Sequence, residues 1–166
     1  MRKQWFASTP QLDAAIKVRF EITWEAAVRG DYDDWRNSPD GCLALTIILD
    51  QLPLNMFRGS AKSFSSEHLA IDVAKHAIAQ TYDLQIDPAQ LAFLYMPLMH
   101  SEHLTDQDQS VALYAAAGLT NNLRFAQHHR DIVSRFGRFP HRNALLGRVS
   151  STAELEYLNS KEAFKG

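Results

Sequence analysis

Polar and charged residues interrupt the apolar pattern of this chain at four places, and their types suit them to chemistry. The interruptions are Asp50–Gln51, Asn55 with Arg58, the string His100–His103, and the stretch from His129 to Arg148. A carboxylate can act as a general base, an imidazole can carry a proton, and an arginine fork can bind phosphate or carboxylate. This combination predicts a pocket for a small anionic ligand.

The spacing around His129 predicts that its side chain points inward. His129 shares one helical stripe with Asn122, Phe125, Ile132 and Phe136. The opposite, hydrated face carries Arg124, His128, Asp131 and Arg135. A single inward histidine is either a satisfied core residue or a proton carrier. Because Asp50, His100 and Glu102 are available as partners, both interpretations stay open.

The charge of the chain is unevenly distributed along the sequence. The 17 basic and 19 acidic residues give a net charge of −2. Between Arg124 and Arg148, six arginines and no lysine accompany one acid, Asp131, so this segment carries +5. The remaining 11 basic and 18 acidic residues carry −7. Arginine without lysine indicates forks directed at carboxylates or phosphates, which include the protein's own Asp50 and Glu102.

Composition excludes several classes of protein. The single cysteine, Cys42, rules out an internal disulfide and a cysteine-rich zinc module. No apolar run approaches the roughly 18 residues of a membrane span, and Met1–Pro10 lacks the apolar core of a signal peptide. We therefore expect a cytoplasmic protein without a membrane partner. The near-neutral total charge makes a nucleic acid an unexpected partner.

Motifs of known cofactor and metal sites are missing. His100 and His103 have a spacing that can place two imidazoles on one ion, but no second fixed ligand spacing supports a metal site. His100-Ser101-Glu102 matches half of the zinc-deaminase signature, whose Pro-Cys-x-x-Cys half is absent. The chain also lacks a P-loop, a dinucleotide-binding glycine motif and a nucleophile elbow. We predict no metal and no other cofactor.

The elements that must position these residues are predicted to be helices. Caps, prolines and glycines delimit helical segments beginning at Pro10, Ser38, Ser65 or Ser66, Pro88, Thr105, Asn121 and Ser151. The apolar run from Ser38 to Pro53 is long for a strand, so we expect a buried helix that ends at Pro53, followed by a loop to Gly59. Likewise, Pro97 is expected to end the helix that starts at Pro88. Short connections indicate antiparallel hairpins in one domain, residues 1–166.

Four strings in the chain resemble a known family. They are Leu49–Gly59, Leu94–Glu102, Arg135–Asn143 and Leu146–Arg148, and Trp5-Phe6 and the capping box at Ser151 also fit. Together they resemble the bacterial family known as domain of unknown function 924. The resemblance implies an all-α fold of about seven helices, arranged as antiparallel hairpins in a tetratricopeptide-like right-handed array. It implies no established activity.

The polar signature of that family falls on thirteen positions of this chain. They are Asp50, Gln51, Asn55, Arg58, His100, Glu102, His129, Arg135, Arg138, His141, Arg142, Asn143 and Arg148. The chain departs from the family pattern at Leu54, where an arginine is usual, and at Met99, where a glutamate is usual. It also begins close to Trp5, without an upstream apolar-aromatic segment.

Three hypotheses follow for these thirteen residues. In the first, the arginines and amides bind a small anion and the candidate catalytic groups Asp50, His100, Glu102 and His129 support a hydrolase or transferase reaction. In the second, the chain is a tetratricopeptide-like module that binds a peptide, for example by its carboxylate, without catalysis. In the third, the arginines pair with the protein's own acids and only stabilise the fold.

Overall fold

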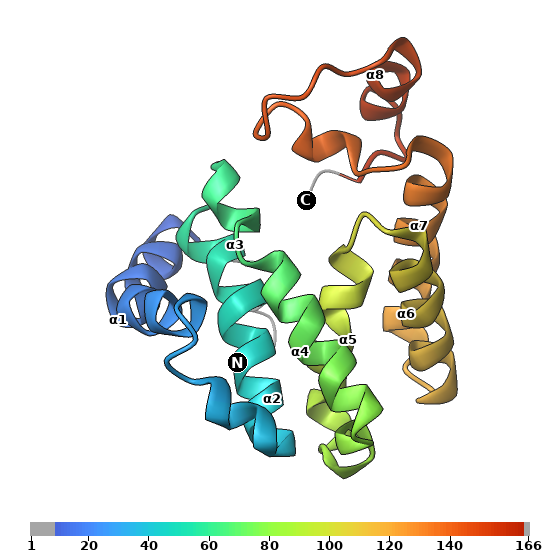
Figure 1. Cartoon of the computed structure of the whole chain (residues 1–166). Helices are drawn as coiled ribbons and strands as arrows, with labels where there is room; N and C mark the ends of the chain where they lie inside the picture. Colours follow the sequence, from blue (N-terminus) through green and yellow to red (C-terminus); the bar gives the residue numbers. More distant parts are fainter. Residues whose placement is uncertain (1–8, 165–166) are drawn as a thin grey trace. The chain divides into compact units, whose positions relative to one another are not determined.

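A computed structural model of the protein describes residues 9–164, and within them it contains helices and no strand (Figure 1). The α-helices are α1 (Pro10–Val28), α2 (Pro39–Thr46), α3 (Leu52–Met56), α4 (Glu67–Ala79), α5 (Pro88–His100), α6 (Leu104–Ala116), α7 (Thr120–Phe136) and α8 (Thr152–Leu158). A π-helical turn, Ile47–Gln51, joins α2 to α3 without a break, so the described residues form seven helical rods. The predicted all-α class is confirmed. Trp5 and Phe6 lie outside the described residues.

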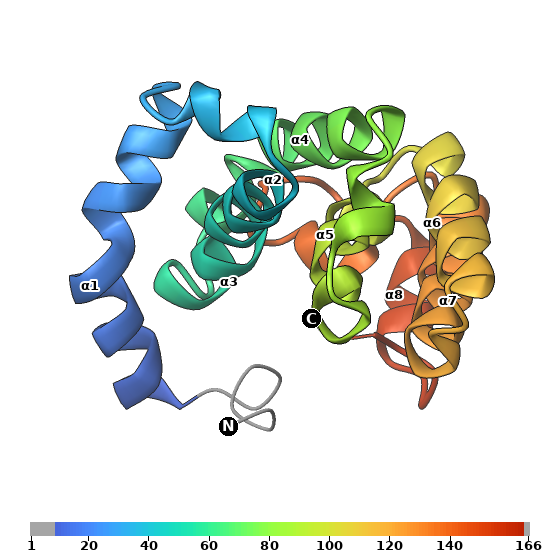
Figure 2. The ribbon, with the colours of Figure 1, turned by 90° about the horizontal axis from the view of Figure 1, so that it is seen from below.

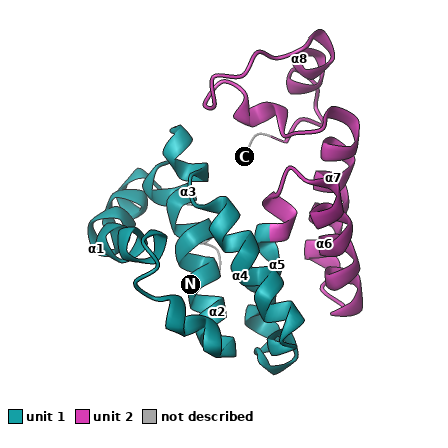
Figure 3. Ribbon diagram, viewed as in Figure 1, with its two compact units in different colours: residues 1–97 teal, residues 98–166 magenta. Residues whose placement is uncertain are grey.

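The chain divides into two compact units, residues 1–97 and residues 98–166 (Figure 3). Helices α1 to α4 belong to unit 1 and α6 to α8 belong to unit 2, while α5 crosses the boundary after Pro97. Each unit is described by itself below. The single domain expected for residues 1–166 stays a prediction.

Unit 1 is built around the continuous helical run from α2 to α3. Helix α1 packs against α3, and α4 packs against α2 (Figure 2). The run is apolar on all sides because it is enclosed: Leu43, Leu45, Leu49 and Leu52 are all buried. Trp24 from α1 meets Phe57 edge to face, with ring centroids 4.9 Å apart.

Several helix ends lie where the sequence places them. The side chains of Thr9 and Ser38 accept hydrogen bonds from the backbone N–H groups of Leu12 and Gly41, which caps α1 and α2. Ser151 and Glu154 form the predicted capping box of α8. The predicted cap at Thr105 is wrong by two residues: His103 is at the N-cap position and α6 begins at Leu104. The Ser101 hydroxyl accepts from the His103 N–H and donates to Asp106.

Pro53 does not end the central helix, and residues 53–56 are helical rather than a loop. Proline lacks the N–H that would bond the carbonyl four residues earlier, here that of Leu49. The buried Ser66 hydroxyl replaces this donor, at 2.6 Å from the Leu49 oxygen, and accepts from Trp24 Nε1 at 2.9 Å. The π-helical turn just before Pro53 also changes the local hydrogen-bond pattern, since the Leu52 N–H donates to the Ile47 carbonyl, five residues earlier.

Pro97 does not end its helix either. Helix α5 contains Pro97 and continues to His100. Just beyond Pro97, the buried Gln107 amide donates to the carbonyls of Met99 and Ser101, at 2.7 and 2.6 Å. These side-chain bonds satisfy carbonyls at the end of the helix that no further helical turn could reach.

Unit 2 centres on a hairpin of α6 and α7. The two helices lie side by side in Figures 1 and 2. Ile132 and Val133 of α7 form a buried cluster with Phe139 and Tyr157. His129 points inward as predicted, with 3% of its surface exposed. Phe125, expected beside it, is 57% exposed. The buried face passes through Ala126, His129 and Val133, so it is rotated slightly away from Phe125.

None of the helices in residues 9–164 is both long and apolar enough to span a membrane.

Gly41 predicts a stability effect in unit 1. A Cβ added at Gly41 would clash with the Trp35 carbonyl, which is backbone and cannot turn aside. We expect Gly41→Ala to lower the free energy of unfolding by about 1–2 kcal/mol, since overpacking costs roughly 1–3 kcal/mol and the better helix propensity of alanine offsets up to about 1 kcal/mol. Urea unfolding followed by circular dichroism measures this change. The exposed Asp40→Ala is the neighbouring control, and equal stability of the two variants would contradict the prediction.

Candidate functional site

The predicted site residues are divided between the two units. Asp50, Gln51, Asn55 and Arg58 lie in unit 1, and the other nine lie in unit 2. The four candidate catalytic residues are therefore split, with Asp50 in the first unit and His100, Glu102 and His129 in the second.

Asp50 and Gln51 occupy the π-helical turn between α2 and α3. Both are buried, with 4% and 9% of their surfaces exposed, and Gln51 Nε2 donates to Asp50 Oδ2. A π-helical turn holds one extra residue in a helix and is frequent at functional sites. The turn thus places an acid–amide pair within the most apolar helical run of unit 1.

Asn55 and Arg58 are held by an acid that the sequence did not single out. Asn55 Nδ2 donates to Asp13 Oδ1 at 2.8 Å, and Arg58 Nε donates to Asp13 Oδ2 at 2.7 Å. Asp13 lies in the first turn of α1, where an acid is usually explained by the helix dipole alone. These bonds link the end of α3 to the start of α1, and more than half of the Arg58 side chain stays exposed.

Glu102 is the acceptor for three donors in unit 2. Arg148 donates through Nη1 and Nη2, at 2.6 and 2.9 Å, and the Phe139 N–H donates at 2.8 Å. Burial raises the pKa of Glu102, but the Arg148 hydrogen bond and the other donors outweigh it, so the pKa lies below its ordinary value. Glu102 is therefore a carboxylate fixed in position.

Arg138 forms a similar fork-to-fork pair with Glu154. Arg138 Nε and Nη2 donate to the two carboxylate oxygens at 2.7 and 2.8 Å, and Nη2 also reaches the Val149 carbonyl. Asn143 and the Ser151 backbone complete the set of donors to Glu154. The Arg138 hydrogen bond is the largest cause that lowers the pKa of Glu154 to about 2. A capping-box glutamate predicts only a local role, so the pair with Arg138 was missed.

His129 and His141 lie in a cluster of rings in unit 2. Phe164 contacts both, with centroid distances of 4.4 Å to His129 and 5.1 Å to His141, and His100 lies 6.5 Å from His129. His129 Nδ1 is 2.8 Å from the Phe125 carbonyl, which makes Nδ1 the protonated nitrogen of the neutral ring. Burial, followed by the charge of His100, lowers the pKa of His129 to about 3, and burial followed by Arg142 lowers that of His141 to about 4.

Arg142 is nine-tenths buried beside this cluster. Its Nη2 donates to the His100 carbonyl at 2.9 Å, and its guanidinium lies 4.7 Å from the Phe139 ring centroid. The stacking uses the flat face of the guanidinium while the edge makes the hydrogen bond.

A surface depression of about 470 Å³ contains two of the predicted ligand-binding arginines. Its lining consists of Arg135, Phe136, Arg138, Ser151, Ala153 and Glu154, all in unit 2. The Arg135 guanidinium stacks on Phe136, 4.7 Å from the ring centroid. Unlike Arg138 and Arg148, the exposed Arg135 forms no ion pair within the described part of the chain.

The spacing of His100 and His103 does not produce two imidazoles on one helix face. His100 is the last residue of α5, and His103 precedes α6 at its N-cap position. In residues 9–164, no three His, Cys, Asp or Glu side chains are grouped so that they could hold a metal ion.

Comparisons with known proteins identify relatives by sequence and by structure. A family model described as a bacterial protein of unknown function (DUF924) matches residues 1–162. A solved structure of a protein of unknown function from Agrobacterium tumefaciens is 36% identical, with a TM-score of 0.90 over 95% of this chain and 89% of that one. No curated protein matches the chain.

Proposed function

Since the chain belongs to the bacterial family of unknown function DUF924, which supplies no activity, we propose from its geometry that it binds a small anion, a phosphate or carboxylate, at the depression containing Arg135 and Arg138. The observation that carries the proposal is the state of Arg135: exposed, stacked on Phe136, and without an acidic partner among the described residues. The lining holds two arginines and one glutamate, so it has an excess positive charge.

Arg138 contributes a donor that is already oriented. Its Nε and Nη2 are engaged by Glu154 and Val149, and these bonds hold the guanidinium plane in place. An oriented group loses little conformational entropy when a ligand binds. Nη1 takes part in none of these bonds and can donate to an anion that also contacts the fork of Arg135.

Binding, rather than turnover, is the function that the geometry supports best. A general base works best when its pKa lies near the working pH, whereas the pKa of His129 is about 3 and that of Glu102 is below its ordinary value. His129 and Glu102 can act in a hydrolase or transferase only if a ligand changes their surroundings. Asp50 and His100 stay candidate catalytic residues for such a reaction.

A peptide carboxylate is the second source of the same ligand chemistry. The Phe136 ring lies in the depression beside the arginines, so a carboxylate attached to an apolar residue would find an apolar contact there. A helical hairpin such as α6–α7 is also the repeating unit of tetratricopeptide-like arrays, which bind peptide ends. This alternative assigns the chain to peptide binding without catalysis.

The test is a titration with inorganic phosphate, citrate and a pair of short peptides ending in Phe, one with a free carboxylate and one amidated. We expect Arg135→Gln to weaken binding at least tenfold, measured by chemical-shift changes in NMR spectra of the native protein and the variant. Arg124→Gln is the matched control, since Arg124 is an exposed arginine on the same helix that does not line the depression.

The ligands separate the alternatives. Saturable binding of phosphate or citrate supports a small-anion site, and selective binding of the free-carboxylate peptide supports a peptide site. If Arg135→Gln and Arg124→Gln weaken binding equally, the anions bind the basic segment without a site and the proposal is wrong.

A further inference from the structure

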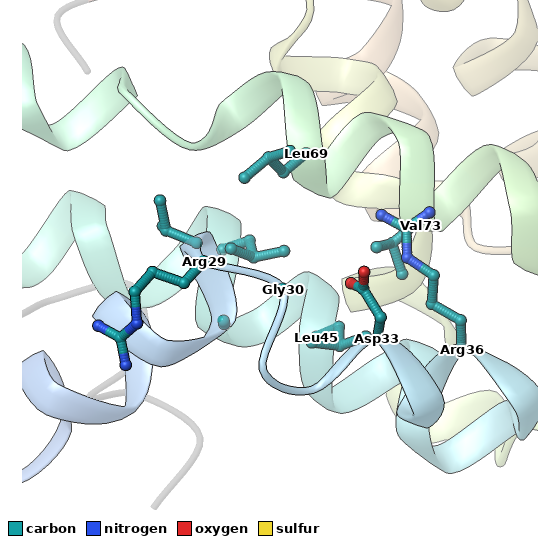
Figure 4. Close-up of a pocket in the computed structure, with 10 residues that line it drawn as sticks. Arg29, Gly30, Asp33, Arg36, Leu45, Leu69 and Val73 are labelled. Atoms are coloured by element: carbon teal, nitrogen blue, oxygen red, sulfur yellow. The ribbon is translucent and has the colours of Figure 1, made fainter.

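Unit 1 contains a cavity of about 250 Å³ that none of the sequence motifs indicates (Figure 4). Most of its lining, the aliphatic wall, consists of Leu45, Leu49, Leu69 and Val73, together with Ala27 and Val28. Asp33 and Arg36 also line the cavity, from the short 3-10 helix Asp33–Asn37. The cavity therefore combines an apolar surface with one acid and one base on the same element.

Arg36 has unused hydrogen-bonding capacity at this cavity. Its Nε atom is buried and has no hydrogen-bond partner. A buried donor without a partner costs roughly 1–3 kcal/mol, so a ligand that accepts from it is favoured. The backbone of the same residue is held firmly, because the Arg36 carbonyl lies 3.1 Å from His76 Nε2 and accepts from Cys42 Sγ.

Asp33 and Arg36 face the cavity without neutralising each other. Figure 4 shows both side chains extending from the short helix toward the cavity, and neither forms an ion pair within the described residues. Asp33 is close to the turn at Gly30: a Cβ added there would lie 3.1 Å from its Oδ2 atom. Because Asp33 and Arg36 do not pair with each other, Asp33 can accept hydrogen bonds from a ligand and Arg36 can donate them. A ligand that carries both a positive and a negative charge can use both residues.

Arg29 does not add a second positive charge to the cavity. Its Nη2 atom pairs with Asp31 at 2.7 Å, and in Figure 4 its guanidinium extends away from Asp33 and Arg36. The lining thus offers one available cation and one available anion. A ligand with only a carboxylate would meet Asp33 as a like charge, and an amine alone would meet Arg36.

The size of the cavity limits the ligand. Pockets for drug-sized molecules and cofactors are usually about 300–1,000 Å³, and this one, at about 250 Å³, is smaller. A nucleotide exceeds it, whereas a single amino acid does not. The aliphatic wall favours a ligand with a branched or unbranched apolar side chain.

We propose that this cavity binds a free α-amino acid with an aliphatic side chain. The carboxylate accepts from the Arg36 guanidinium, the ammonium donates to Asp33, and the side chain packs against Leu45, Leu69 and Val73. This site lies in unit 1 and is independent of the anion site proposed for unit 2. Either proposal can fail without the other.

Isothermal titration of the full chain with L-leucine tests the proposal, with three analogues that each lack one feature. These are 4-methylpentanoate, which lacks the ammonium; 3-methylbutylamine, which lacks the carboxylate; and glycine, which lacks the side chain. We expect saturable binding of leucine and at least tenfold weaker binding of every analogue. If leucine does not bind, the proposal is wrong; if 4-methylpentanoate binds as tightly as leucine, the cavity takes simple carboxylates and Asp33 has no role.

Variants locate the binding in this cavity. Arg36→Met and Asp33→Asn should each weaken leucine binding at least tenfold, while the neighbouring Asp34→Asn, which does not line the cavity, should leave it unchanged. Leu69→Trp should block binding by filling the cavity. Circular dichroism and thermal unfolding of each variant verify folding, and folded variants that all bind leucine normally would overturn the assignment.

Discussion

Replacing Ser66 with alanine is expected to lower the free energy of unfolding by roughly 2–6 kcal/mol, because two buried groups lose their partner. The Ser66 hydroxyl serves two buried partners, since it donates to the Leu49 carbonyl and accepts from Trp24 Nε1. Each buried group that loses its partner costs about 1–3 kcal/mol. Urea unfolding followed by circular dichroism measures the difference from the native protein.

A second substitution isolates the cause of this effect. The Leu49 carbonyl needs Ser66 because Pro53 supplies no N–H, so Pro53→Ala restores a backbone donor to this carbonyl. We expect Pro53→Ala to recover part of the stability lost in Ser66→Ala, which appears as a favourable coupling in a double-mutant cycle. The cost that remains belongs to Trp24, whose indole N–H stays without a partner.

Ser65→Ala is the matched control for this cycle. Ser65 is the adjacent serine, it is exposed, and its hydroxyl donates only to the Lys62 carbonyl. Its replacement should change stability by less than about 0.5 kcal/mol, as surface substitutions usually do. A loss in Ser66→Ala that is no larger than in Ser65→Ala, or additivity of Ser66→Ala and Pro53→Ala, would contradict the role assigned to the hydroxyl.

The hydrogen bond from Ser66 to the Leu49 carbonyl also explains why the helix caps could be predicted from the sequence and the helix beyond Pro53 could not. The caps at Thr9, Ser38 and Ser151 involve residues three positions apart, so the local sequence contains the whole interaction. The helix beyond Pro53 depends on Ser66, which lies 17 residues from the carbonyl it bonds. A proline predicts a helix end only when no distant donor replaces the missing one, and that donor is visible only in the fold.

The same limit applies to the candidate site. The lysine-free arginine segment predicted forks directed at carboxylates, and Arg148 does bind Glu102. The partner of Arg138, however, is Glu154, which the capping box had already explained. The sequence shows which arginines exist but not which acids reach them. Arg135 is distinguished by its place in the depression, where it stacks on Phe136 without an acidic partner among the described residues, and its role as a ligand-binding residue stays a proposal.

Acid is expected to destabilise the protein between pH 7 and pH 5 through His129 and His141. Their pKa values in the folded protein are about 3 and about 4, below the ordinary value of 6.5. The unfolded chain therefore binds protons first, and stability falls as the pH decreases from about 6.5 toward the folded values. Each histidine accounts for about 2 kcal/mol of this loss at pH 5, since one proton is worth about 1.4 kcal/mol per pH unit.

Glu102 and Glu154 contribute little to the change in stability between pH 7 and pH 5. The pKa of Glu154 is lowered to about 2 and that of Glu102 is lowered as well, so both contribute stability that is present above their ordinary value of 4.5 and lost below it. Between pH 5 and pH 7 these two carboxylates stay ionised in the folded state and mostly ionised in the unfolded chain. The slope of stability in this range therefore reports on histidines.

Substituting His129 with phenylalanine should remove about half of that slope. The new ring suits the site, which is bounded by Phe139 and Phe164, and the Phe125 carbonyl keeps its helical backbone donor. The free energy of unfolding, measured at pH 7, 6 and 5, should then fall by about 2 kcal/mol less than in the native protein. His129→Gln also cannot be protonated, and it tests the same prediction if the phenylalanine variant does not fold.

His103→Gln serves as the control, because His103 belongs to the same unit and its side chain is exposed. As a surface substitution, this variant should follow the native protein at all three pH values. If the His129 variants also follow it, the buried imidazole of His129 is not the source of the pH dependence. Phe164 contacts both His129 and His141, and its backbone N–H donates to the Tyr157 hydroxyl at 2.9 Å. In that case this hydrogen bond is the next interaction to monitor as the pH falls.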